Sequence, residues 1–198
     1  MNLHRFVNCD FNEDNVININ IRSLCICVKY FQKSSYKMSK IIEYLYLGNV
    51  DDANNARFLD SINCKIIFNC TKDCKCNSNG RLVYRIPVND DNSVEAMKVM
   101  SMSLIELIPK IETYIDNHNT VFIHCYAGMQ RSAIVVLTYL VYRLNKIYNS
   151  NYTQYSKNYL YAVCKNYMLQ KRPIVFAYGT SVNFERAFNA FCEVARIQ

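Results

Sequence analysis

A nine-residue segment between two apolar runs, His124–Ser132, constrains the fold of this chain more than any other feature. It reads His-Cys-Tyr-Ala-Gly-Met-Gln-Arg-Ser, with Gly128 in its middle. The run before it, residues 120–123, is short and apolar, which is typical of a buried strand. The run after it, residues 133–142, is apolar over a length that favours a buried helix. The sequence therefore predicts a strand, a tight loop and a helix in direct succession.

A loop in this position can bind a phosphate dianion. The first N–H groups of a helix are unpaired and carry partial positive charge, and a loop curled above them can point further N–H groups inward. Gly128 can take the positive φ that such a curl requires, because it has no Cβ atom. A planar guanidinium can hold two phosphate oxygens at once, which a lysine ammonium cannot. The predicted phosphate-binding residues are Tyr126, Ala127, Gly128, Met129, Gln130 and Arg131.

Cys125 is the predicted nucleophile of this loop. A free thiol has a pKa of about 8.5, which helix N-termini and nearby cations lower to roughly 3.5–7.5. The positive field of the loop is therefore expected to stabilise a thiolate. Ser132 is expected to donate its hydroxyl to the sulfur and later to help the sulfur leave phosphorus. His124 is expected to hydrogen-bond nearby backbone and hold the loop in shape, not to act as a general base.

The pattern His-Cys-x-x-Gly-x-x-Arg-Ser resembles the signature of the cysteine-dependent protein phosphatases, in their small dual-specificity branch. It specifies five positions over nine residues, within the strand–loop–helix context described above. The resemblance implies hydrolysis of a phosphate ester through a phosphocysteine, with no metal and no other cofactor. The plainer interpretation is a buried Cys125 and a surface Arg131 in an ordinary connection between a strand and a helix.

A general acid is the second requirement, because the leaving oxygen of a phosphate ester must be protonated. Residues 86–91, Ile-Pro-Val-Asn-Asp-Asp, resemble the Ile-Pro-Val-x-Asp loop of the same family. The resemblance places the acid at Asp90, and a slip of one residue would move it to Asp91. Either carboxylate could instead cap the helix predicted to follow.

Three other segments resemble the family. Residues 41–49 are similar to its opening strand and Tyr-Leu-Gly-Asn turn, and residues 64–70 to its central strand. Residues 171–174, Lys-Arg-Pro-Ile, match its Arg-Arg-Pro-x-Ile motif. Family members usually continue with Pro-Asn and a Gly-Phe pair, whereas residues 175–184 of this chain read VFAYGTSVNF. The resemblance covers residues 38–198.

Alternating strand and helix signals predict one α/β domain, with a central and mostly parallel sheet flanked by helices, as in the protein tyrosine phosphatases. The long helix is expected to kink or split at Pro109. The expected strands lie near residues 44–47, 65–70, 82–88 and 120–124. The expected helices lie near residues 51–60, 94–116, 133–145, 154–170 and 181–195.

The N-terminal 37 residues precede the family-like region and form a separate extension, residues 1–37, ahead of a catalytic domain, residues 38–198. Three interpretations stay open. The extension is a flexible tail, a segment through which two copies of the chain form a homodimer, as resembling poxvirus phosphatases suggest, or an upstream stretch that the working protein lacks.

Composition narrows the setting in which the chain works. It has ten cysteines but no signal peptide and no apolar run near the roughly 20 residues of a membrane span, so an intracellular, reducing compartment is predicted. Cys70, Cys74 and Cys76 are spaced unlike zinc ligands and no histidine lies near them. The heavy use of Asn, Ile, Lys and Tyr, with the overall match, points to a poxvirus-like source, hence to host cytoplasm or virion.

The residues inside the loop and the overall charge indicate a phosphorylated protein as the substrate, on phosphotyrosine and on phosphoserine or phosphothreonine. A net charge of +7 suits anionic partners, but the cations are scattered and no nucleic-acid module is recognised. Lipid phosphatases of the family tend to add Lys inside the loop, and its RNA 5′-triphosphatases carry Thr-His after the Cys and Arg-Thr at the end. This chain has Tyr-Ala and Arg-Ser. An RNA triphosphatase, a phosphate-binding module without turnover and, more distantly, a rhodanese-like sulfurtransferase remain as alternatives.

Overall fold

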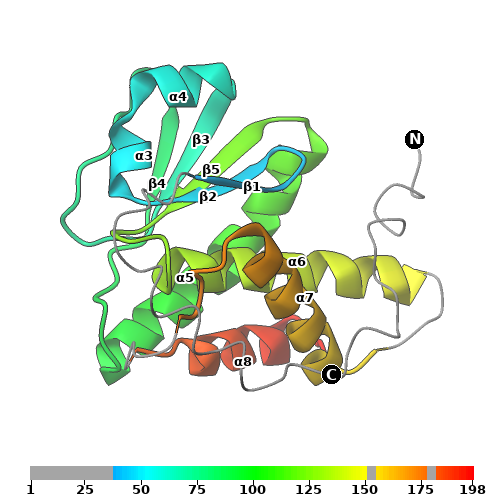
Figure 1. Cartoon of the computed structure of the whole chain (residues 1–198). Coiled ribbons are helices and arrows are strands. Elements are labelled where there is room, and N and C mark those ends of the chain that lie inside the picture. The colour runs from blue at the N-terminus through cyan, green and yellow to red at the C-terminus, as the bar shows by residue number, and fades with distance from the viewer. Residues whose placement is uncertain (1–37, 151–154, 178–181) are drawn as a thin grey trace, which may run out of the picture. The chain divides into compact units, whose positions relative to one another are not determined.

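The computed structural model describes residues 38–150, 155–177 and 182–198 of the chain (Figure 1). The expectations for residues 1–37 lie outside these ranges, as do residues 178–181. The strands are β1 Ser39–Ile42, β2 Leu45–Gly48, β3 Cys64–Asn69, β4 Leu82–Arg85 and β5 Thr120–His124. The helices are α3 Val50–Asn54, α4 Ala56–Ser61, α5 Val94–Asp116, α6 Arg131–Ser150, α7 Lys157–Lys171 and α8 Glu185–Val194.

The five strands form one sheet in the order β1-β2-β5-β3-β4. Only β1 pairs antiparallel, with β2, and the other neighbours are parallel. Strand β5 is buried along its whole length, as its apolar run predicted, and lies between β2 and β3. His124 at its end pairs with Gly48 on one side and with Asn69 on the other. The chain therefore leaves the centre of the sheet at the carboxyl edge of three parallel strands.

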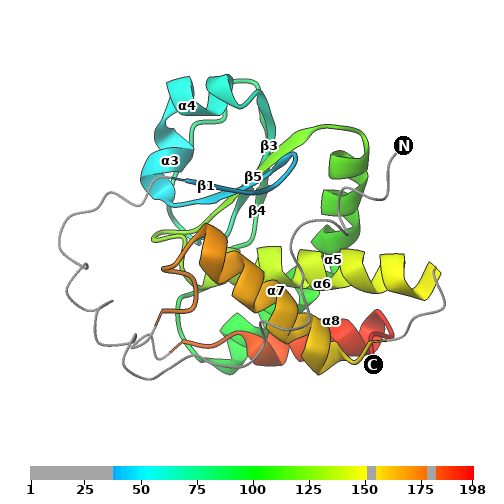
Figure 2. The same ribbon diagram turned by 45° about the vertical axis from the view of Figure 1, so that its right-hand side comes forward.

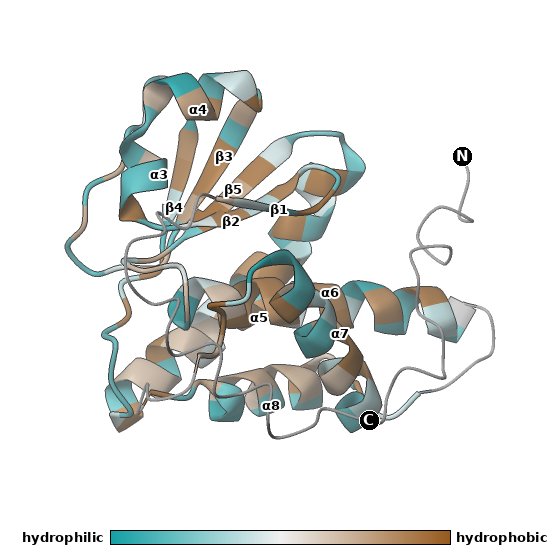
Figure 3. Ribbon diagram, viewed as in Figure 1, coloured by the Kyte–Doolittle hydropathy of each residue, from teal (hydrophilic) through white to brown (hydrophobic). Residues whose placement is uncertain are grey.

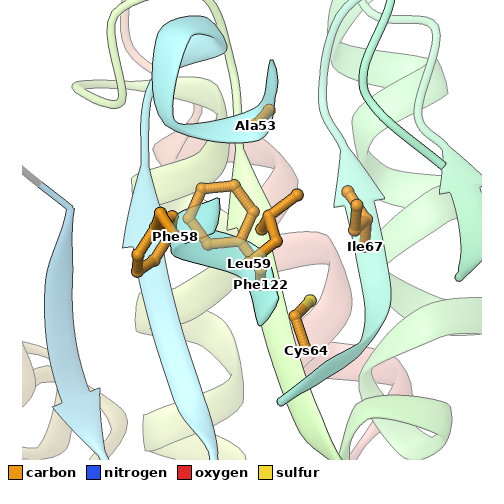
Figure 4. Packing of buried hydrophobic residues seen from close by; sticks show 6 residues of the cluster. All are labelled: Ala53, Phe58, Leu59, Cys64, Ile67 and Phe122. Carbon is orange, nitrogen blue, oxygen red and sulfur yellow. The ribbon is translucent and has the colours of Figure 1, made fainter. Parts of the chain in front are cut away.

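Helices cover both faces of the sheet, so the predicted mixed α/β domain with a largely parallel sheet is confirmed. Helices α3 and α4 lie over one face and α5 to α8 over the other (Figures 1 and 2). Strands β3 and β5 are mostly hydrophobic, as expected of strands covered on both faces (Figure 3). Beneath α3 and α4, one apolar cluster joins the helices to the sheet (Figure 4). Its buried members are Ala53, Phe58, Leu59, Cys64, Ile67 and Phe122. The described helices include no segment with the length and hydrophobicity that a bilayer crossing requires.

The strand expected near residues 44–47 is confirmed as β2, but β1 was not predicted; the two form a hairpin that turns at Tyr44 with a φ of 63°, a value uncommon for a residue with a Cβ atom. Two other local predictions were wrong. The helix expected over residues 51–60 is two short helices, because Asn55 ends α3 and its side chain caps α4 by accepting the N–H of Phe58 at 3.0 Å. The strand expected to reach residue 88 ends at Arg85, two residues before Pro87, which cannot donate to a sheet ladder.

Helix α5 continues through Pro109, so the helix does not split there. Its N-terminus is capped by Ser93, whose Oγ accepts the N–H of Ala96 at 3.1 Å. The apolar residues at helical spacing on one face are buried, whereas the proline is exposed; the buried residues are Met100, Leu104, Leu107, Ile108 and Ile111. Packing of the buried face therefore holds the helix together where the proline removes a backbone hydrogen bond.

Candidate active site

The predicted phosphate loop spans the six residues between β5 and α6. The N–H of Cys70 donates to the carbonyl of His124 at 2.8 Å, which carries the pairing of β3 and β5 to the point where the loop begins. Gly128 has a φ of 68°, and a Cβ atom there would clash with the carbonyl oxygen of Gly48. Both the conformation and the available space therefore require glycine, as the sequence predicted.

The sulfur of Cys125 is buried at the centre of this loop, and two donors point at it. The N–H of Gly128 and the hydroxyl of Ser132 each lie 3.2 Å from Sγ. The hydrogen bond expected from Ser132 is therefore present. Helix α6 begins at Arg131, so its N-terminus also faces the loop. Two hydrogen-bond donors and the positive end of the helix dipole therefore surround the sulfur.

The loop carbonyls are all held by groups from outside the loop. Each of the four carbonyl groups of residues 126–129 accepts a hydrogen bond. The backbone N–H groups of Val50 and Phe176 bind the first and the last of them, at 3.1 and 3.0 Å. The guanidinium of Arg172 binds the two between, with Nη2 at 3.3 Å and Nε at 2.9 Å. Because the C=O and N–H of a peptide group point in opposite directions, this arrangement turns the following N–H groups toward the interior of the loop.

Arg172 was missed as a site residue from the sequence, although the motif that contains it was recognised. The residue is 1% exposed. Helix α7 ends one residue earlier, and Arg172 leaves the helical conformation, with φ −146° and ψ 88°, because the following Pro173 disfavours a helical residue before it. Burial lowers its pKa, while the carboxylate of Asp52 and the thiol of Cys125 act in the opposite direction. The one signal in the sequence was an arginine directly before a helix-ending proline, which does not indicate what the side chain contacts.

Arg131 and Asp90, which were predicted as phosphate ligand and general acid, form an ion pair. Nη2 of Arg131 lies 2.9 Å from Oδ2 of Asp90, and Nη1 donates to the carbonyl of Val88 at 3.4 Å. The arginine side chain is 8% exposed and that of Asp90 is 48% exposed. Nε of Arg131 is buried and has no hydrogen-bond partner among the described residues. The guanidinium therefore has a donor available for an anion, and the candidate acid lies within reach of the same anion.

Asp91, the other candidate acid, has a different set of contacts. It is exposed, and its Oδ1 accepts both the N–H and the hydroxyl of Ser93, the residue that caps α5, at 3.0 and 2.5 Å. These hydrogen bonds lower the pKa of Asp91. Asp91 therefore stabilises the start of α5, whereas Asp90 contacts Arg131, the predicted phosphate ligand.

His124 supports the backbone on which the loop rests. Its Nδ1 lies 3.3 Å from the carbonyl oxygen of Cys125, and its ring stacks on Phe122 with the centroids 5.8 Å apart. Burial lowers the pKa of His124 to about 4. The ring is therefore neutral near pH 7, and Nδ1 must carry the proton in order to donate to the carbonyl. This is the contact expected of a residue that holds the loop in shape.

The side chains of the loop differ in exposure but bring no second cation. Tyr126 and Ala127 are exposed, Met129 is half-buried and Gln130 is almost fully buried. The backbone N–H groups of these residues, not their side chains, therefore remain the candidate ligands for an anion. Within the described ranges, no three His, Cys, Asp or Glu side chains gather as a metal site would need.

Known phosphatases have sequences similar to that of this chain. A model of the dual specificity phosphatase catalytic domain matches residues 45–172. Dual specificity protein phosphatase 1 of the mouse is 32% identical over 109 residues, which are 54% of this chain and 28% of that protein. Human dual specificity protein phosphatase 4 is 32% identical over 103 residues, 52% of this chain and 25% of that protein. The chain thus matches only about a quarter of the length of these relatives.

Solved structures show the same fold at lower sequence identity. The Yvh1 phosphatase domain from Chaetomium thermophilum superimposes with a TM-score of 0.64 at 17% identity, over 81% of this chain and 98% of that one. The OH1 tyrosine phosphatase of the Orf virus superimposes with a TM-score of 0.56 at 18% identity, over 89% and 96%. By the match of its residues 45–172, the chain belongs to the family of dual specificity phosphatase catalytic domains.

Proposed function

We propose that this protein hydrolyses phosphotyrosine and phosphoserine or phosphothreonine in proteins, through a phosphocysteine intermediate. One observation carries the proposal. The sulfur of Cys125 lies at the N-terminus of a helix and accepts hydrogen bonds from Gly128 and Ser132, while Arg131 in the same loop is paired with the acid Asp90. A phosphatase needs a nucleophile that attacks phosphorus, a cation that binds the phosphate oxygens and an acid that protonates the leaving group, and these residues supply all three.

In the first step the loop binds the phosphate of the substrate. The inward N–H groups and the guanidinium of Arg131 hold its non-bridging oxygens, and the thiolate of Cys125 attacks phosphorus in line with the leaving oxygen. A sulfur–phosphorus bond forms as the phosphorus–oxygen bond breaks. Asp90 gives its proton to the departing alkoxide or phenoxide, so the product leaves as a neutral alcohol or phenol.

In the second step water replaces the sulfur. Asp90, now a carboxylate, takes a proton from the water, whose oxygen attacks the phosphocysteine. The sulfur leaves as a thiolate, and the hydroxyl of Ser132, 3.2 Å from it, stabilises the returning charge. Inorganic phosphate is released, and Cys125 and Asp90 return to their starting states.

Two alternatives are less well supported. A triphosphorylated RNA end carries more negative charge, yet the loop side chains add no cation to Arg131. A module that only bound phosphate would need the arginine but would not need a sulfur that accepts two hydrogen bonds. It would also not need a carboxylate beside the arginine, because that negative charge weakens the binding of an anion. These alternatives and the proposal predict different substrate profiles.

Assays of three substrates test the proposal directly. A phosphotyrosine peptide and a phosphothreonine peptide should release phosphate, and triphosphorylated RNA should not release its γ-phosphate. The Cys125→Ser variant should lose turnover while it still binds inorganic phosphate, because the N–H groups and the guanidinium remain. Hydrolysis of a phosphopeptide by Cys125→Ser at the normal rate would rule out the assigned nucleophile.

We also propose a setting for this activity. A thiolate nucleophile works only in its reduced form, so a reducing intracellular compartment is proposed, namely host cytoplasm or virion if the source is a poxvirus-like virus. The heavy use of Asn, Ile, Lys and Tyr supports this origin. Residues 38–198 are proposed as the catalytic domain and residues 1–37 as a dimerisation segment. Sedimentation equilibrium of the full chain would test the dimer, since a monomeric mass at micromolar concentration contradicts it.

A further inference from the structure

A buried arginine lies under the phosphate loop and takes no part in the mechanism above. Arg172 reaches the loop from the end of α7, more than 40 residues away in sequence, and bonds the carbonyls of Ala127 and Gly128. A Cβ atom on Gly128 would lie 2.7 Å from its Nη2, so the guanidinium packs directly against that glycine. The loop and the arginine therefore fix the position of each other.

The two carbonyls that Arg172 holds determine where two N–H groups point. A peptide group is planar and trans, so the N–H that follows an outward C=O points inward. The carbonyl of Ala127 shares its peptide group with the N–H of Gly128, and that N–H is the one found 3.2 Å from the sulfur of Cys125. By the same geometry, the carbonyl of Gly128 orients the N–H of Met129.

An arginine suits this position better than a lysine. Nε and Nη2 lie on one edge of a rigid planar group, and each meets a different carbonyl, whereas an ammonium group is a single point of charge. Asp52, in the first turn of α3, provides the negative charge that faces the buried guanidinium. The carboxylate is itself held by the N–H of Asn49 at 3.1 Å. The negative charge of Asp52 thus offsets part of the cost of burying the guanidinium that holds the loop.

We propose that Arg172 is a positioning residue for phosphate binding, which orients the N–H groups of Gly128 and Met129 toward the substrate through the carbonyls of the loop. The inference rests on the proposed function only in that the loop must bind a phosphate. Without the guanidinium, either peptide group can rotate and present a carbonyl oxygen to an anion, which repels it. The cost should fall on phosphate affinity and on kcat/KM, since N–H donors of this kind act on the charge of the transition state.

The test compares Arg172→Lys and Arg172→Met with a matched control, Lys171→Met. Lys171 is exposed, carries the same charge and lies one residue away, with its ammonium group over the ring of Tyr167. The measurements are kcat and KM for p-nitrophenyl phosphate, the dissociation constant of inorganic phosphate from calorimetry, and hydrogen–deuterium exchange of the loop peptide.

Arg172→Met should lower kcat/KM on the order of 100-fold, the lower end of the range found for loss of an oxyanion donor. Arg172→Lys should lower it less, on the order of 10-fold, because an ammonium group can still bind one of the two carbonyls. Phosphate should bind more weakly in the same order, and Lys171→Met should match the natural chain. Faster exchange should be confined to residues 125–131, because a general loss of stability would also expose β3 and β5. If Arg172→Met does not fold, Arg172→Lys decides alone.

Three results would overturn the inference. They are a natural phosphate affinity in folded Arg172→Lys, an equal loss in Lys171→Met, or exchange that rises as much in β3 and β5 as in the loop. Failure of the proposed function looks different. The natural chain would then bind phosphate without hydrolysing the aryl ester, and the calorimetry of the Arg172 variants would still test the positioning role.

Discussion

Replacing Asp90 with Asn should make this protein bind inorganic phosphate more tightly while it slows catalysis. The carboxylate of Asp90 lies 2.9 Å from Nη2 of Arg131, a donor that a bound phosphate would also use. Carboxylate and phosphate therefore compete for one guanidinium. Asparagine has nearly the same shape but no charge, so the substitution removes the competitor and leaves the arginine in place.

The size of the effect follows from the geometry of the pair. Two unit charges about 4 Å apart attract by about 1 kcal/mol in water and by about 4 kcal/mol at an effective dielectric constant near 20. The side chain of Asp90 is 48% exposed, so solvent screens the pair and the lower value applies. Removing the repulsion between Asp90 and a bound dianion adds a similar amount. The expected gain is about 1–2 kcal/mol, or roughly 5- to 30-fold in the dissociation constant.

Asp91→Asn is the matched control, because it removes the same charge from the next residue of the same loop. Asp91 is exposed and accepts its hydrogen bonds from Ser93, whereas Arg131 pairs with Asp90, so screening should limit the effect of Asp91→Asn to about twofold at most. Calorimetric titration with inorganic phosphate at pH 7 and 0.1 M salt (roughly a 10 Å Debye length) measures both variants. If Asp90→Asn binds phosphate no more tightly than Asp91→Asn does, the competition between Asp90 and phosphate for Arg131 does not exist.

Kinetics on the same two variants test the second role of Asp90. Loss of a general acid typically costs roughly 100- to 10,000-fold, and the loss should be largest for substrates with poor leaving groups, since these most need a proton. Asp90→Asn should therefore lose far more activity on an alkyl phosphate than on p-nitrophenyl phosphate. A larger loss in Asp91→Asn would move the acid by one residue.

Three further predictions concern the loop and its support. Ser132→Ala should slow release of the sulfur, so that phosphocysteine on Cys125 accumulates and a rapid burst of p-nitrophenol precedes a slower steady state, as rapid-mixing absorbance would show. Gly128→Ala should lower both phosphate affinity and melting temperature, because its Cβ meets the carbonyl of Gly48 at a φ of 68°, and calorimetry with thermal unfolding would measure both. Burial lowers the pKa of His124 from 6.5 to about 4, so the unfolded chain binds a proton there that the folded chain does not. The free energy of unfolding should therefore fall by about 3 kcal/mol as the pH falls from above 6.5 to 4. Urea unfolding at several pH values should show that His124→Asn lacks this part of the pH dependence.

The sequence was sufficient for the strand, the loop and the helix that carry the reactive groups. Each of these depends on a local property, namely an apolar run before Cys125, one glycine where φ is positive, and an apolar run after Ser132. The same holds for the long helix, whose buried positions follow its apolar spacing. Local patterns predict such elements because the residues that decide them are neighbours in the chain.

The sequence was not sufficient where a side chain had two possible uses. Asn55 could have continued a helix or ended one, and its Oδ1 bond to the N–H of Phe58 decides the matter in the folded chain. Tyr44 turns a hairpin without the Gly or Asn that usually marks a positive φ. The resemblance favoured Asp90 as the acid but left Asp91 as an alternative, and the contacts with Arg131 and Ser93 now distinguish the two carboxylates.

The orientation of the loop is the part of the site that no local pattern contains. Cys125, Gly128 and Arg131 lie within seven residues, but the carbonyls between them are held by the N–H of Val50, by Arg172 and by the N–H of Phe176, which come from three separate segments. A peptide group that rotates by half a turn exchanges a donor for an acceptor, so the same nine residues could attract an anion or repel it. The signature motif supplies the reactive groups, and the surrounding fold determines the direction of their dipoles. Substitutions at the outer contacts should therefore reduce phosphate binding even though they leave every residue of the motif unchanged.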